Sequence, residues 1–243
     1  MRISTFAATD AGQVRRGNED SYFRGATVVA VADGLGGHQA GEVASATAIE
    51  PVAGLDKRTF TTPEQARDAL VGAIKEGNNA VIAKAMADSD YWGMGTTMTA
   101  AAVAGDRWLQ LAHVGDSRAY LLRAGRLRQL TDDHTIVAEL VRQGRLTAEE
   151  AAHHPERSIL TRAVGLDPAL KVDTPPPLEL EPGDQLLLCS DGLTEPVAEE
   201  RIVEILRGDD GRAVCHALVD AANAAGGPDN VTVVLLRAAP PPP

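Results

Sequence analysis

The stretch VVAVADG, residues 28–34, is an apolar run that ends directly in an aspartate and a glycine. The same order of residues returns in LLLCSDG, residues 186–192, and in a looser form in LAHVGDS, residues 111–117. Short apolar runs bounded by turn residues are typical of buried strands. The sequence therefore predicts three strands that each end at an aspartate.

The aspartates at these strand ends are Asp33, Asp116 and Asp191, and a fourth, Asp229, lies in GGPDN just before another apolar run. Carboxylates at the ends of neighbouring strands converge on one rim of a sheet, and glycine allows close approach there. Four carboxylates would repel one another unless cations neutralise them. Oxygen ligands with few His or Cys candidates favour Mg²⁺ and Mn²⁺ over zinc. A single Asp-Gly is an ordinary turn signal, so it is the recurrence that indicates a site.

The rest of the chain alternates strand-like and helical patterns. Strands are predicted at 4–9, 27–32, 97–103, 108–114, 118–123, 185–189 and 231–237, and helices at 41–52, 63–86, 198–206 and 211–225. Short turns at 104–106 and 123–126 suit antiparallel hairpins. We find no internal repeat and no Ser/Gly linker, so the sequence predicts a single α+β domain with antiparallel sheet.

Composition excludes several classes of protein. The chain has 243 residues, 44% of them hydrophobic, and a net charge of −11, which argues against general affinity for nucleic acid. No apolar run reaches the roughly 20 residues that a membrane helix needs. The first ten residues, MRISTFAATD, do not form a secretory signal. We therefore expect a cytoplasmic protein whose two cysteines, Cys189 and Cys215, are reduced core thiols.

The C-terminal end differs from the rest. Residues 238–243 read AAPPPP, a polyproline-type stretch that is not expected to join a sheet. We expect one domain over 1–238 and a proline-rich tail over 239–243 that begins a linker. A membrane anchor beyond that tail is the alternative context, in which this chain is the cytoplasmic domain of a longer protein.

Six motifs in order resemble one family. They are RRGNED, VADGLGGHQAGE, MGTT, HVGDSR, LCSDGL and GGPDNVT. Together they closely resemble the bacterial branch of the PPM family of metal-dependent protein Ser/Thr phosphatases (protein phosphatase 2C-like), over about residues 9–234. The resemblance implies a four-layer αββα sandwich, two antiparallel β-sheets flanked by helices, with a flap subdomain at about 131–165.

The resemblance also implies a set of metal ligands. Asp33 matches the carboxylate that bridges two Mg²⁺ or Mn²⁺ ions, and the backbone carbonyl of Gly34 matches a further ligand. Asp191 and Asp229 match the other ligands of this core pair. Asp116, together with Asp191, resembles the ligands of a weaker third ion.

Other positions match residues that act on the substrate. Arg15 matches the arginine that clamps the substrate phosphate, and its fork of donors suits phosphate oxygens. Asp20 is expected to act through a water on the metal, with Glu19 assisting. His38, in a glycine-rich loop, is the candidate general acid for the departing Ser or Thr alkoxide. A loop histidine that orients water or backbone is the alternative for His38.

The remaining histidines are expected to have lesser roles. His113 precedes the Gly-Asp turn on a strand and is expected in the core or next to the ligands. His153 and His154 are expected to be solvated flap residues. Some relatives place a histidine three residues after the flap proline, where this chain has Ser158.

Competing chemistries leave signatures that this sequence lacks. A cysteine phosphatase needs an arginine six residues after its cysteine, where this chain has Glu195 and Ala221. A calcineurin-type enzyme would show GDxHG, and GDSRAY has only the first two letters. A binding-only pseudophosphatase is disfavoured because the ligand set is present, and a stress-pathway phosphatase because no sensor domain is visible.

The expected function is metal-dependent hydrolysis of phosphoserine and phosphothreonine in proteins. A metal-activated water would attack phosphorus without a phosphoenzyme. The expected partners are phosphorylated proteins, namely a bacterial Ser/Thr kinase and its substrates, with neither nucleic acid nor a membrane segment involved.

Overall fold

The structure is a computed structural model that describes residues 1–36 and 39–240. The strands are β1 (Arg2–Asp10), β2 (Ser21–Arg24), β3 (Val28–Ala32), β4 (Gly34–Leu35), β5 (Gly95–Thr96), β6 (Met98–Ala104), β7 (Trp108–Val114), β8 (Arg118–Arg123), β9 (Arg126–Gln129), β10 (Leu178–Glu179), β11 (Gln185–Cys189) and β12 (Val231–Ala239). The helices are α1 (Gln39–Ala53), α2 (Pro63–Ala87), α3 (Ile136–Arg142), α4 (Ala148–Ala152), α5 (Asp191–Thr194), α6 (Glu199–Leu206) and α7 (Gly211–Ala224).

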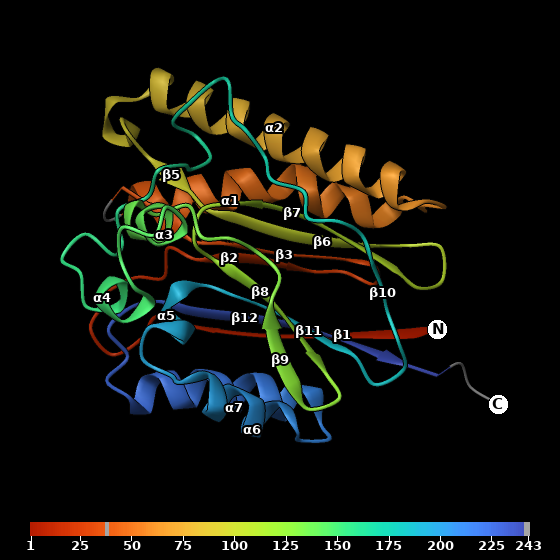
Figure 1. Ribbon diagram of the computed structural model, residues 1–243. Helices are drawn as coiled ribbons and strands as arrows, with labels where there is room; N and C mark the ends of the chain where they lie inside the picture. Colours follow the sequence, from red (N-terminus) through yellow and green to blue (C-terminus); the bar gives the residue numbers. More distant parts are fainter. Residues whose placement is uncertain (37–38, 241–243) are drawn as a thin grey trace.

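Two five-stranded sheets form the centre of the fold (Figure 1). One sheet has the strand order β1-β12-β11-β8-β9 and the other β10-β7-β6-β3-β2. Every pairing between these strands is antiparallel. Helices α1 and α2 cover the second sheet on its outer side, and α6 and α7 cover the first.

The alternation of side chains along β3 explains its uninterrupted apolar sequence. Val28, Ala30 and Ala32 pack in the core beneath α1 and α2. Val29 and Val31 point the other way, into the core between the two sheets. A strand that is covered on both faces needs apolar residues at every position, because successive side chains point to opposite faces.

The strand β11 repeats this arrangement in the other sheet. Leu187 and Cys189 pack toward α6 and α7, whereas Leu186 and Leu188 enter the core between the sheets. Three separate apolar cores therefore lie between four layers. The predicted αββα sandwich of two antiparallel sheets flanked by helices is confirmed.

Helix ends follow the expected chemistry. The side chain of Thr62 accepts a hydrogen bond from the backbone N–H of Gln65, and Pro63 occupies the first helical position of α2. Asp210 caps α7 through the N–H of Arg212. No helix among the described residues is long and apolar enough to cross a bilayer.

The structure differs from the sequence prediction at five short strands and at the C-terminal end. Strands β2, β4, β5, β9 and β10 were not predicted, because each has only two to four residues. The expectation that residues 238–243 stay out of the sheet is wrong for Ala238 and Ala239, which pair with Ile3 and Arg2. These alanines keep the backbone N–H groups that prolines lack.

The acidic strand ends and the predicted flap lie at the same end of the molecule. The flap segment carries the short helices α3 and α4 (Figure 1). It follows β9, and α5 begins at Asp191 directly after β11. The chain between β9 and β10 therefore passes beside the predicted metal ligands.

The core between the sheets is the expected source of much of the stability. We predict that Leu188→Ala, at a fully buried position, lowers the free energy of unfolding by about 2–5 kcal/mol. Met86→Ala is the control, because Met86 is 82% exposed and surface changes stay within about 0.5 kcal/mol. Denaturant unfolding measures both. Equal losses would contradict the assignment of this core.

Candidate metal centre

Five aspartates gather at one rim of the sandwich. Asp33 follows β3, Asp116 lies two residues after β7, and Asp191 begins α5 after β11. Asp20 precedes β2, and Asp229 lies two residues before β12. All five side chains are partly buried. The structure thus brings together the aspartates that the sequence assigned to one site.

Electrostatics show that these carboxylates lie within reach of one another. Burial raises the pKa of Asp33 well above its ordinary value. The negative charges of Asp20, Asp191, Asp116 and Asp229 raise that pKa further. Asp33 is therefore surrounded by the other four carboxylates, as expected for the residue predicted to bridge two ions.

The neighbouring carboxylates are affected in the same direction. Burial raises the pKa of Asp20 to about 7, that of Asp116 to about 8 and that of Asp191 to about 6. The charge of Asp191 contributes to the first two shifts, and Asp229 contributes to the third. Such shifts report a need for positive charge at this rim.

Two carboxylate oxygens lack any hydrogen-bond partner among the described residues. They are Oδ1 of Asp20 and Oδ1 of Asp191, and both are buried. The other oxygen of Asp20, Oδ2, accepts a hydrogen bond from Ser190 Oγ at 2.8 Å. Buried carboxylate oxygens without donors are uncommon, and divalent cations that prefer oxygen ligands would satisfy them.

The carboxylates lie near one another, but their oxygens do not converge on one position. Among the described residues, no three Asp, Glu, His or Cys side chains already converge as an ion requires. Asp229 Oδ2 instead accepts a hydrogen bond from Arg15 Nη2 at 2.6 Å. The chemistry of the donor set, carboxylate oxygens with two of them unpartnered, fits a hard cation.

The backbone around Asp33 is held in place by two threonines. Thr97 Oγ1 accepts from the N–H of Asp33 at 2.9 Å, and Thr96 Oγ1 donates to its carbonyl at 2.7 Å. The next residue, Gly34, pairs with Thr96 in the short β4–β5 ladder. A Cβ at Gly34 would lie 2.2 Å from the carbonyl oxygen of Gly41. Only glycine fits there without a shift of backbone.

Asn230 and Ser190 are functional candidates that stand in the quoted motifs but were given no role there. Ser190 is a candidate because it donates to Asp20. Asn230 Oδ1 accepts from the N–H of Glu19 at 2.8 Å, and its Nδ2 donates to the carbonyls of Ala11 and Gly17. It therefore fixes the loop that carries Arg15. No local sequence signal distinguishes this asparagine from an ordinary turn residue.

The histidines are placed as follows. His38 lies outside the described residues, so its predicted role as general acid stays a prediction. His113 is buried, with Nδ1 at 2.8 Å from Thr99 Oγ1, which confirms its core position. Burial lowers the pKa of His113 to about 3, so it stays neutral. His153 is exposed, as predicted, whereas His154 is half-buried.

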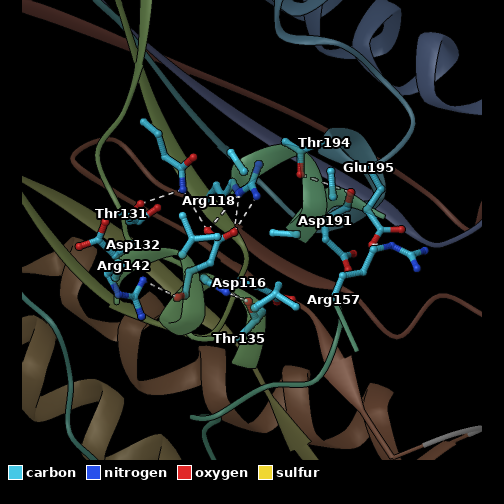
Figure 2. A pocket seen from close by; sticks show the side chains of 18 of the residues that line it. Asp116, Arg118, Thr131, Asp132, Thr135, Arg142, Arg157, Asp191, Thr194 and Glu195 are labelled. Carbon is cyan, nitrogen blue, oxygen red and sulfur yellow. Dashed lines mark hydrogen bonds and ion pairs between the residues drawn. The ribbon is translucent and has the colours of Figure 1, made fainter. Parts of the chain in front are cut away.

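A groove of about 1000 Å³ opens beside the acidic rim (Figure 2). Asp116 and Asp191 line one end of it, and Arg142, Arg157 and Glu195 supply further charge. The flap side is lined by small apolar residues, namely Val137, Ala138, Val141, Ala148, Ala151 and Ala152. The groove therefore joins the predicted metal ligands to the flap.

Comparison with known proteins gives consistent matches. The family model for protein phosphatase 2C matches residues 13–218. The chain is 46% identical over 235 residues to the serine/threonine protein phosphatase PstP of Mycobacterium tuberculosis, covering 94% of this chain and 44% of PstP. It is 41% identical over 239 residues to the serine/threonine phosphatase Stp of Listeria monocytogenes, covering 94% of this chain and 93% of Stp.

Solved structures agree with these matches. A crystal structure of Mycobacterium tuberculosis PstP superposes with a TM-score of 0.93 at 44% identity, covering 99% of this chain and 100% of that one. The catalytic domain of PstP in complex with two manganese ions gives a TM-score of 0.90 at 42% identity, covering 98% and 99% of the two chains.

The layered fold and its acidic rim are thus shared with bacterial relatives that are named serine/threonine phosphatases. The chain belongs to the protein phosphatase 2C family. It spans less than half the length of Mycobacterium tuberculosis PstP, at 44%.

The raised pKa of Asp116 predicts how stability changes with pH. Without ions, the folded chain keeps this proton up to about pH 8, whereas the unfolded chain releases it above about pH 4. The folded state binds more protons in this window, so the free energy of unfolding falls as pH rises. Asp116→Asn removes the titration. In EDTA at pH 8 we expect the variant to melt several degrees above wild type, since about 1 kcal/mol corresponds to about 2–4 °C.

Thermal unfolding of both proteins from pH 5 to pH 8 measures this difference. The gap between variant and wild type should widen as pH rises, and Mn²⁺ at pH 8 should raise the wild-type midpoint. Parallel curves for the two proteins in EDTA would contradict the carboxylate repulsion inferred here.

Proposed function

We propose that this chain hydrolyses phosphoserine and phosphothreonine in proteins, with Mg²⁺ or Mn²⁺ ions held by the acidic rim. The observation that carries this proposal is the gathering of four partly buried aspartates around Asp33, two of them with unpartnered oxygens. The named relatives are serine/threonine phosphatases, and one solved relative contains two manganese ions.

The ligands of the core pair would be Asp33, Asp191, Asp229 and the backbone carbonyl of Gly34. Asp116 would hold a weaker third ion together with Asp191. When bound, such ions lower the pKa of water and stabilise the charge that develops on a phosphoryl group. Asp20, whose Oδ1 is buried without a donor, would orient water beside these ligands.

No protein nucleophile is needed for this chemistry. Burial raises the pKa of both Cys189 and Cys215 to about 12, so neither thiol ionises at neutral pH. Both thiols are buried within the fold. A covalent cysteine intermediate is therefore not part of the proposal.

Arg15 would bind the substrate phosphate. Its side chain is 52% exposed and stands at the edge of the acidic rim, where it donates to Asp229. When Asp229 binds a cation instead, the guanidinium is free to donate to phosphate oxygens. A planar fork of donors suits two oxygens of one phosphate.

The groove beside the flap would hold the protein segment around the phosphorylated residue. Its wall of alanines and valines leaves room for a chain to lie against α3 and α4. Arg142 and Arg157 would favour acidic residues in that segment. This placement puts the flanking residues next to Asp116 and Asp191.

The partners would be phosphorylated proteins, including a bacterial Ser/Thr kinase and its substrates. The net charge of −11 makes nucleic acid a poor partner. The proposal includes a cytoplasmic location for this domain.

The metal assignment predicts the loss of activity on removing a ligand. Asp33→Ala and Asp191→Asn should each lower Mn²⁺-dependent hydrolysis of p-nitrophenyl phosphate by more than about 100-fold, since even hydrogen-bond partners of metal ligands cost 10–100-fold. Asp90→Asn is the matched control and should keep wild-type activity, because Asp90 is exposed and is not one of the five aspartates of the rim. Retained activity in either ligand variant, with the fold intact by circular dichroism, would defeat the assignment.

The leaving group provides a test for His38. An alkoxide departing from phosphothreonine needs a proton, whereas p-nitrophenolate hardly does. We expect His38→Ala to lower kcat more with a phosphothreonine peptide than with p-nitrophenyl phosphate, by about 10-fold or more. Equal losses with the two substrates would remove the general-acid role.

A further inference from the structure

His134 contacts the turn before Asp116 through two hydrogen bonds. The side chain of His134 is 1% exposed and follows β9 at the base of the flap. Its Nδ1 accepts from the backbone N–H of Gly115 at 2.9 Å. Its own backbone N–H donates to the carbonyl of Gly115 at 2.8 Å. Both backbone polar groups of Gly115 are thus held by this one residue.

The tautomer of His134 follows from these contacts. Because Nδ1 accepts a hydrogen bond, the ring proton of the neutral imidazole is on Nε2. Nε2 lies 3.1 Å from Asp173 Oδ2, to which it donates. The other oxygen of Asp173 accepts from Arg162 Nη1 at 2.6 Å. Asp173 and Arg162 therefore hold the ring in the orientation that Gly115 requires.

Gly115 lies in a turn that has no room for a side chain. Its φ is +107°, in the region that favours glycine. A Cβ on Gly115 would lie 2.6 Å from the Thr97 side chain. The turn is therefore enclosed between Thr97 on one side and His134 on the other, and Asp116 is the next residue.

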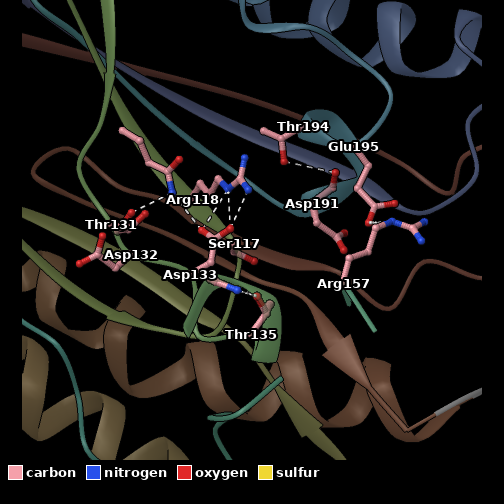
Figure 3. Close-up of polar contacts among 12 residues, drawn as sticks. Ser117, Arg118, Thr131, Asp132, Asp133, Thr135, Arg157, Asp191, Thr194 and Glu195 are labelled. Carbon is pink, nitrogen blue, oxygen red and sulfur yellow. Dashed lines mark hydrogen bonds and ion pairs between the residues drawn. The ribbon is translucent and has the colours of Figure 1, made fainter. Parts of the chain in front are cut away.

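The residue before His134 holds the other side of the same turn. Asp133 accepts from Arg118 at Nε, 3.0 Å, and at Nη2, 2.6 Å (Figure 3). Asp116 lies between Gly115 and Arg118 in sequence, so the pair Asp133-His134 fixes the chain on both sides of it. Both contacts come from the base of the flap.

Residues near the two ends of the flap segment are hydrogen-bonded to each other around His134. The N–H of Thr161 donates to the carbonyl of His134 at 2.8 Å, and Ile136 N–H donates to the carbonyl of Ile159 at 2.9 Å. Arg162, next to Thr161, donates to Asp173, and Asp173 also accepts from the His134 ring. A displacement of either end of the flap segment would therefore move His134 and, with it, the Gly115–Asp116 turn.

We propose that His134 is a positioning residue that sets the affinity of the cation bound with Asp116. It does so by fixing Gly115 and thereby the direction of the Asp116 carboxylate, and it links that affinity to the position of the flap. The inference rests on the proposed function only in taking Asp116 as a cation ligand. Residues that orient metal ligands through hydrogen bonds typically change metal affinity by about 10–100-fold.

Two near-isosteric variants separate the contacts of His134. In His134→Asn the amide oxygen takes the place of Nδ1 and keeps an acceptor for Gly115, while the link to Asp173 is lost. In His134→Gln the amide nitrogen takes the place of Nε2 and keeps the link to Asp173, while the acceptor for Gly115 is lost. His216→Gln is the matched control, at an exposed histidine on α7.

The main readout is Mn²⁺ binding by isothermal titration calorimetry, with p-nitrophenyl phosphate hydrolysis across Mn²⁺ concentrations as the second. We expect His134→Gln to weaken the lower-affinity Mn²⁺ site about 10-fold, with KM for substrate unchanged, and His134→Asn to restore most of that loss. Equal weakening in both variants, or no change in Mn²⁺ affinity in the Gln variant, would overturn the proposal.

A double-mutant comparison tests whether His134 acts through Asp116. In the Asp116→Asn background, His134→Gln should have no further effect on Mn²⁺ affinity. A further loss of similar size would show that His134 acts elsewhere. The melting midpoint in EDTA identifies variants that fail to fold. Absence of Mn²⁺-dependent hydrolysis in wild type would instead count against the proposed function, and the calorimetric comparison would still decide the role of His134.

Discussion

Repulsion among buried carboxylates is the constraint on which the rest of the structure depends. Asp33 is partly buried and faces the charges of four other aspartates. Each of these charges disfavours the others, and desolvation adds to the cost. The cluster is therefore expected to be stable only when protons or cations are bound.

The sandwich keeps the carboxylates together by placing them at the ends of strands that cannot move independently. Strands β3 and β7 belong to one sheet, and β11 and β12 belong to the other. The core between the sheets locks the two halves in register. The rim therefore receives ligands from both sheets, which explains why ligands far apart in sequence form one centre.

Local sequence patterns predicted the main strands and the gathering of aspartates at their ends for a physical reason. An apolar run buried on both faces, followed by Asp-Gly, is readable because burial and strand termination are local properties. The resemblance in motif order then gave the four layers and the ligand set. The short strands β2 and β9 left no comparable pattern.

Contacts between distant side chains were not predictable in this way. Arg15 meets Asp229 across 214 positions, and Ser190 meets Asp20 across 170. The contact of His134 with Gly115 spans only 19 positions, yet it depends on how the flap folds back. No propensity or spacing encodes such pairs, because they follow from the packing of the whole domain.

The most direct test of the metal centre is a crystal structure of the chain grown with Mn²⁺, with the ions located by anomalous scattering. Two anomalous peaks bridged by Asp33, with Asp191 and Asp229 as further ligands and Arg15 released from Asp229, are the predicted result. An acidic rim with no anomalous peak between these carboxylates at saturating Mn²⁺ would contradict the account.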